Sequence, residues 1–169
     1  MDQDVRATKL QGVNYSNGRH NLAAQKGFYM YYYEEIPYAQ INNSIRWEVQ
    51  NTANFCLKNM RMNQTVFIYF TRQVVAGKRL HFGKLFQNSF NDWQGLAIFD
   101  SREILLDAEK LKSHYDYALC TCHEMRHQFI GVRGTHDERE LDAILYAKAA
   151  VNEIYNGIPC NRPEFSTVE

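Results

Sequence analysis

The sequence lacks the features that mark several specialised classes of protein. Glycine and proline are sparse, at nine and three residues, and no internal repeat, linker or low-complexity segment is visible. No apolar run approaches the length of about 18 residues that a transmembrane helix requires. The N-terminus has no apolar stretch of the kind found in secretory signal peptides. We therefore expect a globular protein with no membrane association.

The charges show no excess of either sign. Lys and Arg together number 19, Asp and Glu also number 19, and the formal net charge is zero. Nucleic-acid-binding proteins usually carry a basic excess. The composition therefore gives no clear indication of nucleic-acid binding.

The four cysteines do not form a recognisable framework. Cys120 and Cys122 are spaced as C-x-C, which lacks the geometry of the C-x-x-C metal and redox motifs. We expect small buried thiols rather than a disulfide or a ligand pair. Reduced thiols and the lack of an export signal predict a cytoplasmic location.

The length and composition indicate one globular domain. The 169 residues are 45% hydrophobic and 14% aromatic, which is enough to build a substantial core. We assign residues 1–169 to a single domain, with 1–26 as a polar N-terminal extension and 157–169 as a loose tail. The sequence does not predict the oligomeric state.

Hydrophobic patterns predict an α+β fold. Segments rich in β-branched and aromatic residues predict five strands, at 27–36, 65–76, 79–86, 95–100 and 102–107. A turn at Gly77–Lys78 is expected to separate the second and third of them. Apolar residues at helical spacing predict a helix over 39–62, a second from Ser113 to Gly131, and a third that ends near Tyr155. The expected architecture is a small mixed sheet packed on a backing helix and a helical pair.

The most informative motif lies in the second helix. His123-Glu124-Met125-Arg126-His127 is an H-E-x-x-H, for which chance alone gives odds on the order of 1% in a chain of this size. Two histidines four residues apart share one helix face, so both can bind a single metal ion. Glu124 flanks that face and can act as general base on a metal-bound water. The motif predicts a catalytic zinc site that needs a third ligand.

The next helix offers carboxylates for that third position. Glu138 and Asp142 are four residues apart on one face, so one can bind the metal while the other orients a histidine. Thr135-x-x-Glu138 and Asp137-x-x-Glu140 also fit the capping-box pattern. Either glutamate can therefore be a helix cap and nothing more.

Residues 117–147 resemble the HExxH zinc metallopeptidases of the gluzincin type, and are most similar to the ImmA/IrrE-like peptidases. Those families carry a pattern like E-x-E-A-D-x-x-A on the second helix. Aligned to it, Glu138 takes the place of the glutamate ligand and Asp142 that of the supporting aspartate. Leu141 replaces the usual Ala, and the connection from His127 is short. These departures leave Glu140 open as the ligand instead.

Other zinc patterns fit less well. A metzincin reads H-E-x-x-H-x-x-G-x-x-H, and Ile130 and Arg133 stand where its Gly and third His would be. His136 remains an alternative third ligand, as the third His is in SprT-like proteases. The possible third ligands are therefore Glu138, Glu140 and His136.

The resemblance implies a minimal zincin fold and a zinc-dependent endopeptidase. In such an enzyme His123, His127 and Glu138 hold Zn²⁺, Glu124 is the general base and Asp142 orients a ligand. Tyr146, His114 and Arg133 are candidates for stabilising the oxyanion. By resemblance, segment 95–100 is the sheet edge that pairs with extended substrate. ImmA/IrrE-like enzymes are associated with cleavage of transcriptional repressors, so the implied partner is a protein or peptide such as a transcriptional regulator.

Three rival hypotheses come from other classes of protein. The first is a catalytically silent zincin-fold module that binds or regulates, although a structural site would not need Glu124. The second is an SprT-like, DNA-associated protease, which the zero net charge disfavours. The third is a structural protein that binds no metal, and a zinc assay excludes it directly.

Overall fold

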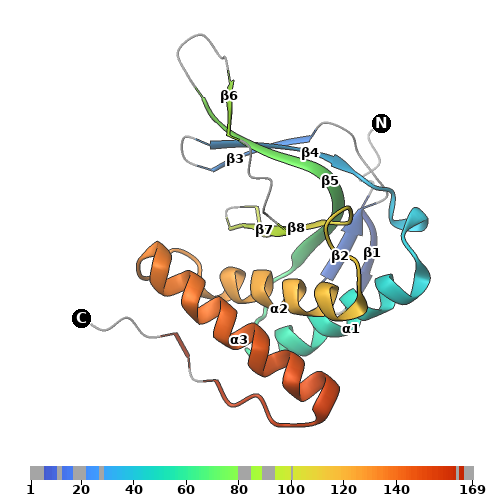
Figure 1. Cartoon of the computed structure of the whole chain (residues 1–169), viewed down its shortest axis with the longest axis vertical. Helices are drawn as coiled ribbons and strands as arrows, with labels where there is room; N and C mark the ends of the chain where they lie inside the picture. Colours follow the sequence, from blue (N-terminus) through green and yellow to red (C-terminus); the bar gives the residue numbers. More distant parts are fainter. Residues whose placement is uncertain are drawn as a thin grey trace.

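The computed structural model describes residues 6–10, 13–16, 22–26, 29–79, 85–88, 94–99, 101–162 and 164–165. Side chains are described for residues 35–72, 94–99, 101–162 and 164–165. Within these ranges the protein is α+β, with a mixed sheet and three α-helices, as the sequence predicts. The helices lie together on one side of the sheet (Figure 1).

The sheet is organised around one long strand, β5 (Val66–Arg79). Its first half pairs in parallel with β2 (Val13–Ser16) and β8 (Glu103–Asp107). Its second half pairs antiparallel with β4 (Tyr29–Glu35) and β6 (Leu85–Asn88). The outer pairs are antiparallel: β1 (Arg6–Leu10) joins β2, β3 (Leu22–Lys26) joins β4, and β7 (Gly95–Ile98) joins β8.

The first helix, α1 (Asn43–Asn59), covers part of the core and follows a short 3-10 turn, η1 (Tyr38–Gln40). The Asn42 side chain caps α1 by accepting a hydrogen bond from the backbone of Ser44. Val49 is fully buried whereas Trp47 is 64% exposed, so the face of α1 that packs on the core includes Val49.

The helical pair consists of α2 (His114–Ile130) and α3 (His136–Asn156). Ser113 and Asp116 form a capping box at the start of α2, and Gly131 ends it with φ of 65°. Gly157 ends α3 in the left-handed conformation. The predicted extent of α2 and the predicted end of α3 are therefore confirmed.

The core lies between the helices and the N-terminal half of β5 together with β8. Strand β8 is buried along its whole length, as expected for a strand that lies inside the sheet beneath the helices. On α3 the buried stripe is Ala143, Tyr146, Ala147, Ala150 and Val151. The helical spacing of Ile144 with Ala147 and Val151 predicts that it also faces inward, but it is 40% exposed.

Two predictions about the ends and turns of elements are wrong, and part of a third falls outside the residues that the structure describes. Gly77 and Lys78 do not form a turn, because β5 continues through them and both pair with β4 and β6. Segment 1–26 is more than an extension, since β1, β2 and β3 lie within it and belong to the sheet. Residues 80–84 of the predicted strand 79–86 lie outside the described residues.

The predicted loose tail contacts the helices at a few of its described residues, although most of them are exposed. After α3 the chain turns back and runs alongside that helix (Figure 1). Cys160 is buried, and its carbonyl accepts a hydrogen bond from the Asn59 side chain on α1. Arg162 lies 3.7 Å from the carboxylate of Asp142. Among the described residues, no helix combines the length and apolar character needed to cross a membrane.

Candidate metal centre

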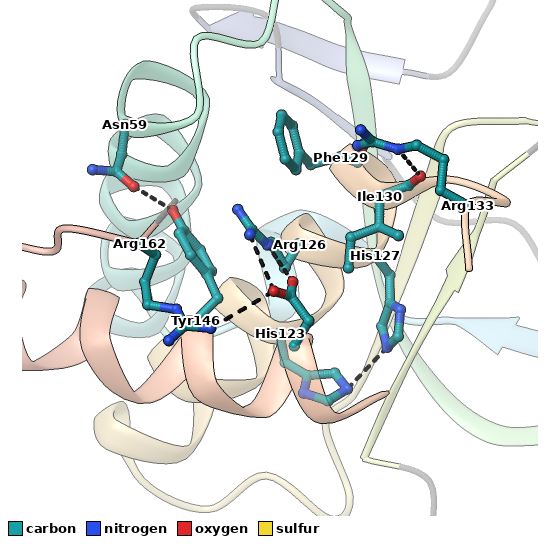
Figure 2. A network of polar contacts seen from close by, with 10 residues as sticks. Asn59, His123, Arg126, His127, Phe129, Ile130, Arg133, Tyr146 and Arg162 are labelled. Atoms are coloured by element: carbon teal, nitrogen blue, oxygen red, sulfur yellow. Dashed lines mark hydrogen bonds and ion pairs between the residues drawn. The ribbon is translucent and has the colours of Figure 1, made fainter. Parts of the chain in front are cut away.

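Helix α2 brings the two motif histidines onto one face. The Nε2 atoms of His123 and His127 lie 3.1 Å apart, and the rings meet edge to face. Figure 2 shows both imidazoles projecting from α2 toward the same point. The convergence predicted from the H-E-x-x-H spacing is therefore present in the structure.

Glu140 of α3 is the carboxylate that faces these histidines. Its Oε1 lies 2.9 Å from Nε2 of His127, and its Oε2 lies 3.4 Å from Nε2 of His123. Of all groups of His, Cys, Asp and Glu among the described residues, only His123, His127 and Glu140 converge closely enough to hold a metal ion. The alternative kept open by the sequence thus has the geometry of the third ligand.

Glu138, assigned above as the third ligand, has a different role in the structure. Its carboxylate accepts a hydrogen bond of 2.9 Å from the backbone N–H of Thr135, and Thr135 caps α3 in return. A residue at this position of a capping box turns back toward the start of its own helix. The prediction of Glu138 facing the histidines is therefore wrong, and Glu140 replaces it.

The distances within the triad fit a tetrahedral metal ion. With metal–ligand bonds of 2.0–2.1 Å, two ligand atoms of a tetrahedral zinc lie roughly 3.3 Å apart. The 3.1 Å between the two imidazole nitrogens is close to that value, and the two carboxylate oxygens of Glu140 lie 2.9 and 3.4 Å from one imidazole nitrogen each. Two imidazoles and one carboxylate also match the donor set of catalytic zinc sites, which leave one position open.

Electrostatics within the triad favour a negative Glu140. Hydrogen bonds to His123 and His127 lower the pKa of Glu140 well below its usual value, despite partial burial. Burial alone would lower the pKa of His123, but its hydrogen bond to Glu140 and the charges of Glu124 and Glu140 outweigh that effect and raise it. The carboxylate of Glu140 is therefore held in its ionised form beside the two imidazoles, which is the form that can bind a cation.

Glu124 lies beside the triad and is buried. It is 6% exposed, and its carboxylate accepts a hydrogen bond from the backbone N–H of Ala97 on β7. Burial raises the pKa of Glu124, while the neighbouring histidines and the Ala97 N–H act in the opposite direction. The residue predicted to be the general base thus occupies the wall of the pocket next to the ligands.

Gly95 allows β7 to approach α2 at this point, a role that sequence reasoning missed. A Cβ added at Gly95 would lie 2.5 Å from the sulfur of Cys120, 3.1 Å from the carbonyl oxygen of Leu105 and 3.2 Å from Cγ of Glu124. Only glycine fits where a strand lies this close to a helix. A glycine at the start of an apolar strand was the available signal for such contact.

A Gly95→Ala substitution is expected to push β7 away from α2. Overpacking of this kind costs typically 1–3 kcal/mol of unfolding free energy, measured by urea denaturation. The matched control is Gly95→Ala combined with Cys120→Ala, which removes the closest contact and should restore part of the loss beyond the cost of Cys120→Ala alone. An additive double variant would contradict the close packing of β7 on Cys120.

The Arg126–Asp142 pair joins the two helices behind the ligands. Arg126 is 2% exposed, and its Nε and Nη2 donate to the Asp142 carboxylate at 2.6 and 3.3 Å. Its guanidinium also lies over the rings of Phe129 and Tyr146 (Figure 2). Asp142 was predicted to orient a histidine, and the structure corrects this. It binds Arg126, so it fixes α3, and with it Glu140, against α2.

The predicted oxyanion groups all lie away from the ligands. The hydroxyl of Tyr146 donates to Asn59 in the core, and Arg133 donates to the carbonyls of Phe129 and Ile130 at the end of α2. His114 begins α2 and contacts Ser44 and Glu48 on α1. None of the three lines the cleft described next.

The triad opens into a cleft of about 590 Å³ between β7, α2 and the start of α3. Leu96, Phe99 and Leu119 contribute apolar surface on the β7 and α2 side. His136 and Arg139 line the α3 side, outside the ligand set. His136 is one turn before Glu140 on the same helix face but is not part of the converging triad.

Comparisons with known proteins assign no family to the chain. No family model matches the chain, and no match was found among curated proteins or solved structures. The function must therefore be argued from the chemistry of the site.

Proposed function

We propose that the protein is a zinc-dependent metallopeptidase that hydrolyses internal peptide bonds. The observation that carries the proposal is the convergence of His123, His127 and Glu140, with Glu124 beside them in an open cleft. A purely structural zinc site is usually closed by four protein ligands. Three ligands together with a flanking carboxylate are typical of a hydrolytic site.

Each residue has a definite role in this proposal. His123, His127 and Glu140 hold the ion, and Asp142 keeps Glu140 in place through Arg126. Zinc, when bound, lowers the pKa of a water ligand toward 7 and polarises the scissile carbonyl. Glu124 accepts the proton of the attacking water and then delivers it to the nitrogen of the leaving amine.

His136 is our candidate for stabilising the tetrahedral oxyanion, instead of Tyr146, His114 and Arg133, which lie away from the cleft. It lines the cleft, and the helical spacing places it on the same face as Glu140. Removing such a donor typically lowers kcat by about 10²–10³. We expect His136→Ala to show a loss of this size with zinc content unchanged, and equal kcat in variant and wild type would exclude the role.

Strand β7 is proposed to hold the substrate main chain. One edge of β7 pairs with β8, and no described strand pairs with the other edge. An extended peptide can add to such an edge through main-chain hydrogen bonds. The partner is then a protein or peptide with an accessible extended segment, such as a transcriptional regulator. The four cysteines are free and buried, which agrees with action in the cytoplasm.

Digestion of a peptide library derived from a cell extract tests the proposal. Zinc-loaded protein should cleave internal bonds, and 1,10-phenanthroline should stop cleavage until zinc is restored. Mass spectrometry of the new termini gives the readout. Zinc-loaded protein that cleaves nothing, or cleavage that persists after the metal is removed, would contradict the proposed function.

A further inference from the structure

Apart from the residues at the candidate metal site, the charge on the walls of the cleft is positive. The two carboxylates that line it, Glu124 and Glu140, are both engaged at the candidate metal site. The other charged side chain on its walls is Arg139 of α3, with His136 nearby. The other described residues that line the cleft are apolar or neutral. Arg139 is therefore a cation at a cleft whose two acidic residues, Glu124 and Glu140, both belong to the candidate metal site.

Arg139 is held in place by the turn between α2 and α3. Its Nη1 donates to the carbonyl oxygen of Gly134 at 2.5 Å and lies 3.4 Å from that of Arg133. These acceptors use one nitrogen of the guanidinium, and no ion pair joins Arg139 to a carboxylate among the described residues. The N–H groups on Nη2 and Nε therefore remain available for a ligand in the cleft.

The neighbouring arginine shows a different arrangement. Arg133 donates to the carbonyls of Phe129 and Ile130 and lies over the rings of Phe129 and Phe165. Its guanidinium therefore contacts the end of α2 and the C-terminal segment. Arg139, by contrast, reaches the cleft itself.

We propose that Arg139 binds a carboxylate of the substrate, and that the cleft thereby selects peptides with a negative charge close to the scissile bond. A guanidinium whose position is already fixed loses little entropy on binding, and its planar fork matches a carboxylate. A basic side chain at the same place would be repelled by Arg139 and by the bound cation. This inference rests on the proposed metallopeptidase function.

The carboxylate can come from an acidic side chain or from the C-terminus of the peptide. Short peptide hydroxamates separate these sources and need no catalysis, because the hydroxamate binds the zinc ion directly. One series carries Asp or the isosteric Asn at each position in turn. A second series has a free or an amidated C-terminus. Affinity is measured by isothermal titration calorimetry with zinc-loaded protein.

The wild-type protein should bind the acid member of at least one series roughly tenfold to a hundredfold more tightly, as expected for hydrogen bonds to a charged group. Arg139→Gln should remove this preference and leave the affinity for the neutral members unchanged. Lys148→Gln is the matched control, because it removes the same charge from an exposed position on the opposite face of α3 and should keep the preference.

The outcomes distinguish a failure of the proposed carboxylate site at Arg139 from a failure of the proposed metallopeptidase function. A preference confined to the Asp series identifies an acidic side chain and agrees with cleavage of internal bonds. One confined to the second series identifies a terminal carboxylate, and would replace cleavage of internal bonds by removal of C-terminal residues. If the protein binds the acid and the neutral hydroxamates with equal affinity, the role of Arg139 is wrong and the zinc site is unaffected. If no hydroxamate binds, the proposed function fails and the carboxylate site fails with it.

Discussion

Glu124→Gln should strongly reduce the rate of peptide hydrolysis and leave zinc bound. A positioned general base contributes typically 10²–10⁴ in rate, and the amide of glutamine cannot accept the proton of water. Glutamine has nearly the same shape, and its side-chain oxygen can still accept the Ala97 N–H hydrogen bond. We therefore expect kcat to fall by about that factor, with zinc content and thermal stability close to those of the wild type.

The control for this substitution is Glu109→Gln, which removes the same charge from an exposed turn before α2. It should have wild-type activity in the same assay. If the wild type, Glu124→Gln and Glu109→Gln all bind one zinc and none cleaves any peptide, the catalytically silent module is the correct hypothesis. Full activity in Glu124→Gln would show that another group is the base.

Asp142→Ala should cost about 3–5 kcal/mol of unfolding free energy, as removing one partner of a buried ion pair generally does. The substitution removes the carboxylate bound by a guanidinium that is 2% exposed, at the contact between α2 and α3. Urea denaturation of the zinc-free protein measures the loss without any contribution from the metal. Arg162→Ala is the control, and should cost less than about 1 kcal/mol because Arg162 is partly exposed and lies 3.7 Å from Asp142.

A double variant tests whether the pair itself explains that loss. Arg126→Met with Asp142→Leu replaces both charges by apolar groups of similar size, which is often neutral or stabilising. We expect the double variant to be markedly more stable than Asp142→Ala. A double variant at least as unstable as Asp142→Ala would show that the packing of Arg126 between Phe129 and Tyr146 matters more than its charge.

The helix that carries the motif could be predicted from the sequence because its signals are local. Ser113 and Asp116 specify its start, Gly131 specifies its end, and the spacing of His123 and His127 brings the rings together. None of these features depends on the rest of the chain. The α+β class follows in the same way from the alternation of strand-rich and helix-rich segments.

The third ligand depends on how α3 is rotated, which local patterns specify less well. Ala143, Ala147 and Ala150 are buried, and extending this stripe back by one turn leads to Glu140 rather than Glu138. The alignment with the family pattern pointed to Glu138, whose capping role was recognised as the competing interpretation. The capping box determines where that side chain points.

Contacts between distant segments could not be read from the sequence. The polar strands β1, β2 and β3 join the sheet through pairing with β2, β5 and β4, and hydrophobic pattern alone gave them no signal. The burial of Arg126 depends on Asp142 and Tyr146 of another helix. The packing of Cys160 depends on a chain reversal after Gly157.

Zinc titration of four proteins tests the metal centre most directly: the wild type, His127→Ala, Glu140→Ala and Glu138→Ala. The wild type should bind one zinc ion. Loss of His127 or Glu140 should weaken binding by more than the roughly 10–100-fold typical of losing a supporting group. Glu138→Ala should bind as the wild type does, with a modest loss of helix stability. Tight binding without Glu140 and weak binding without Glu138, or no binding by the wild type, would contradict the site described above.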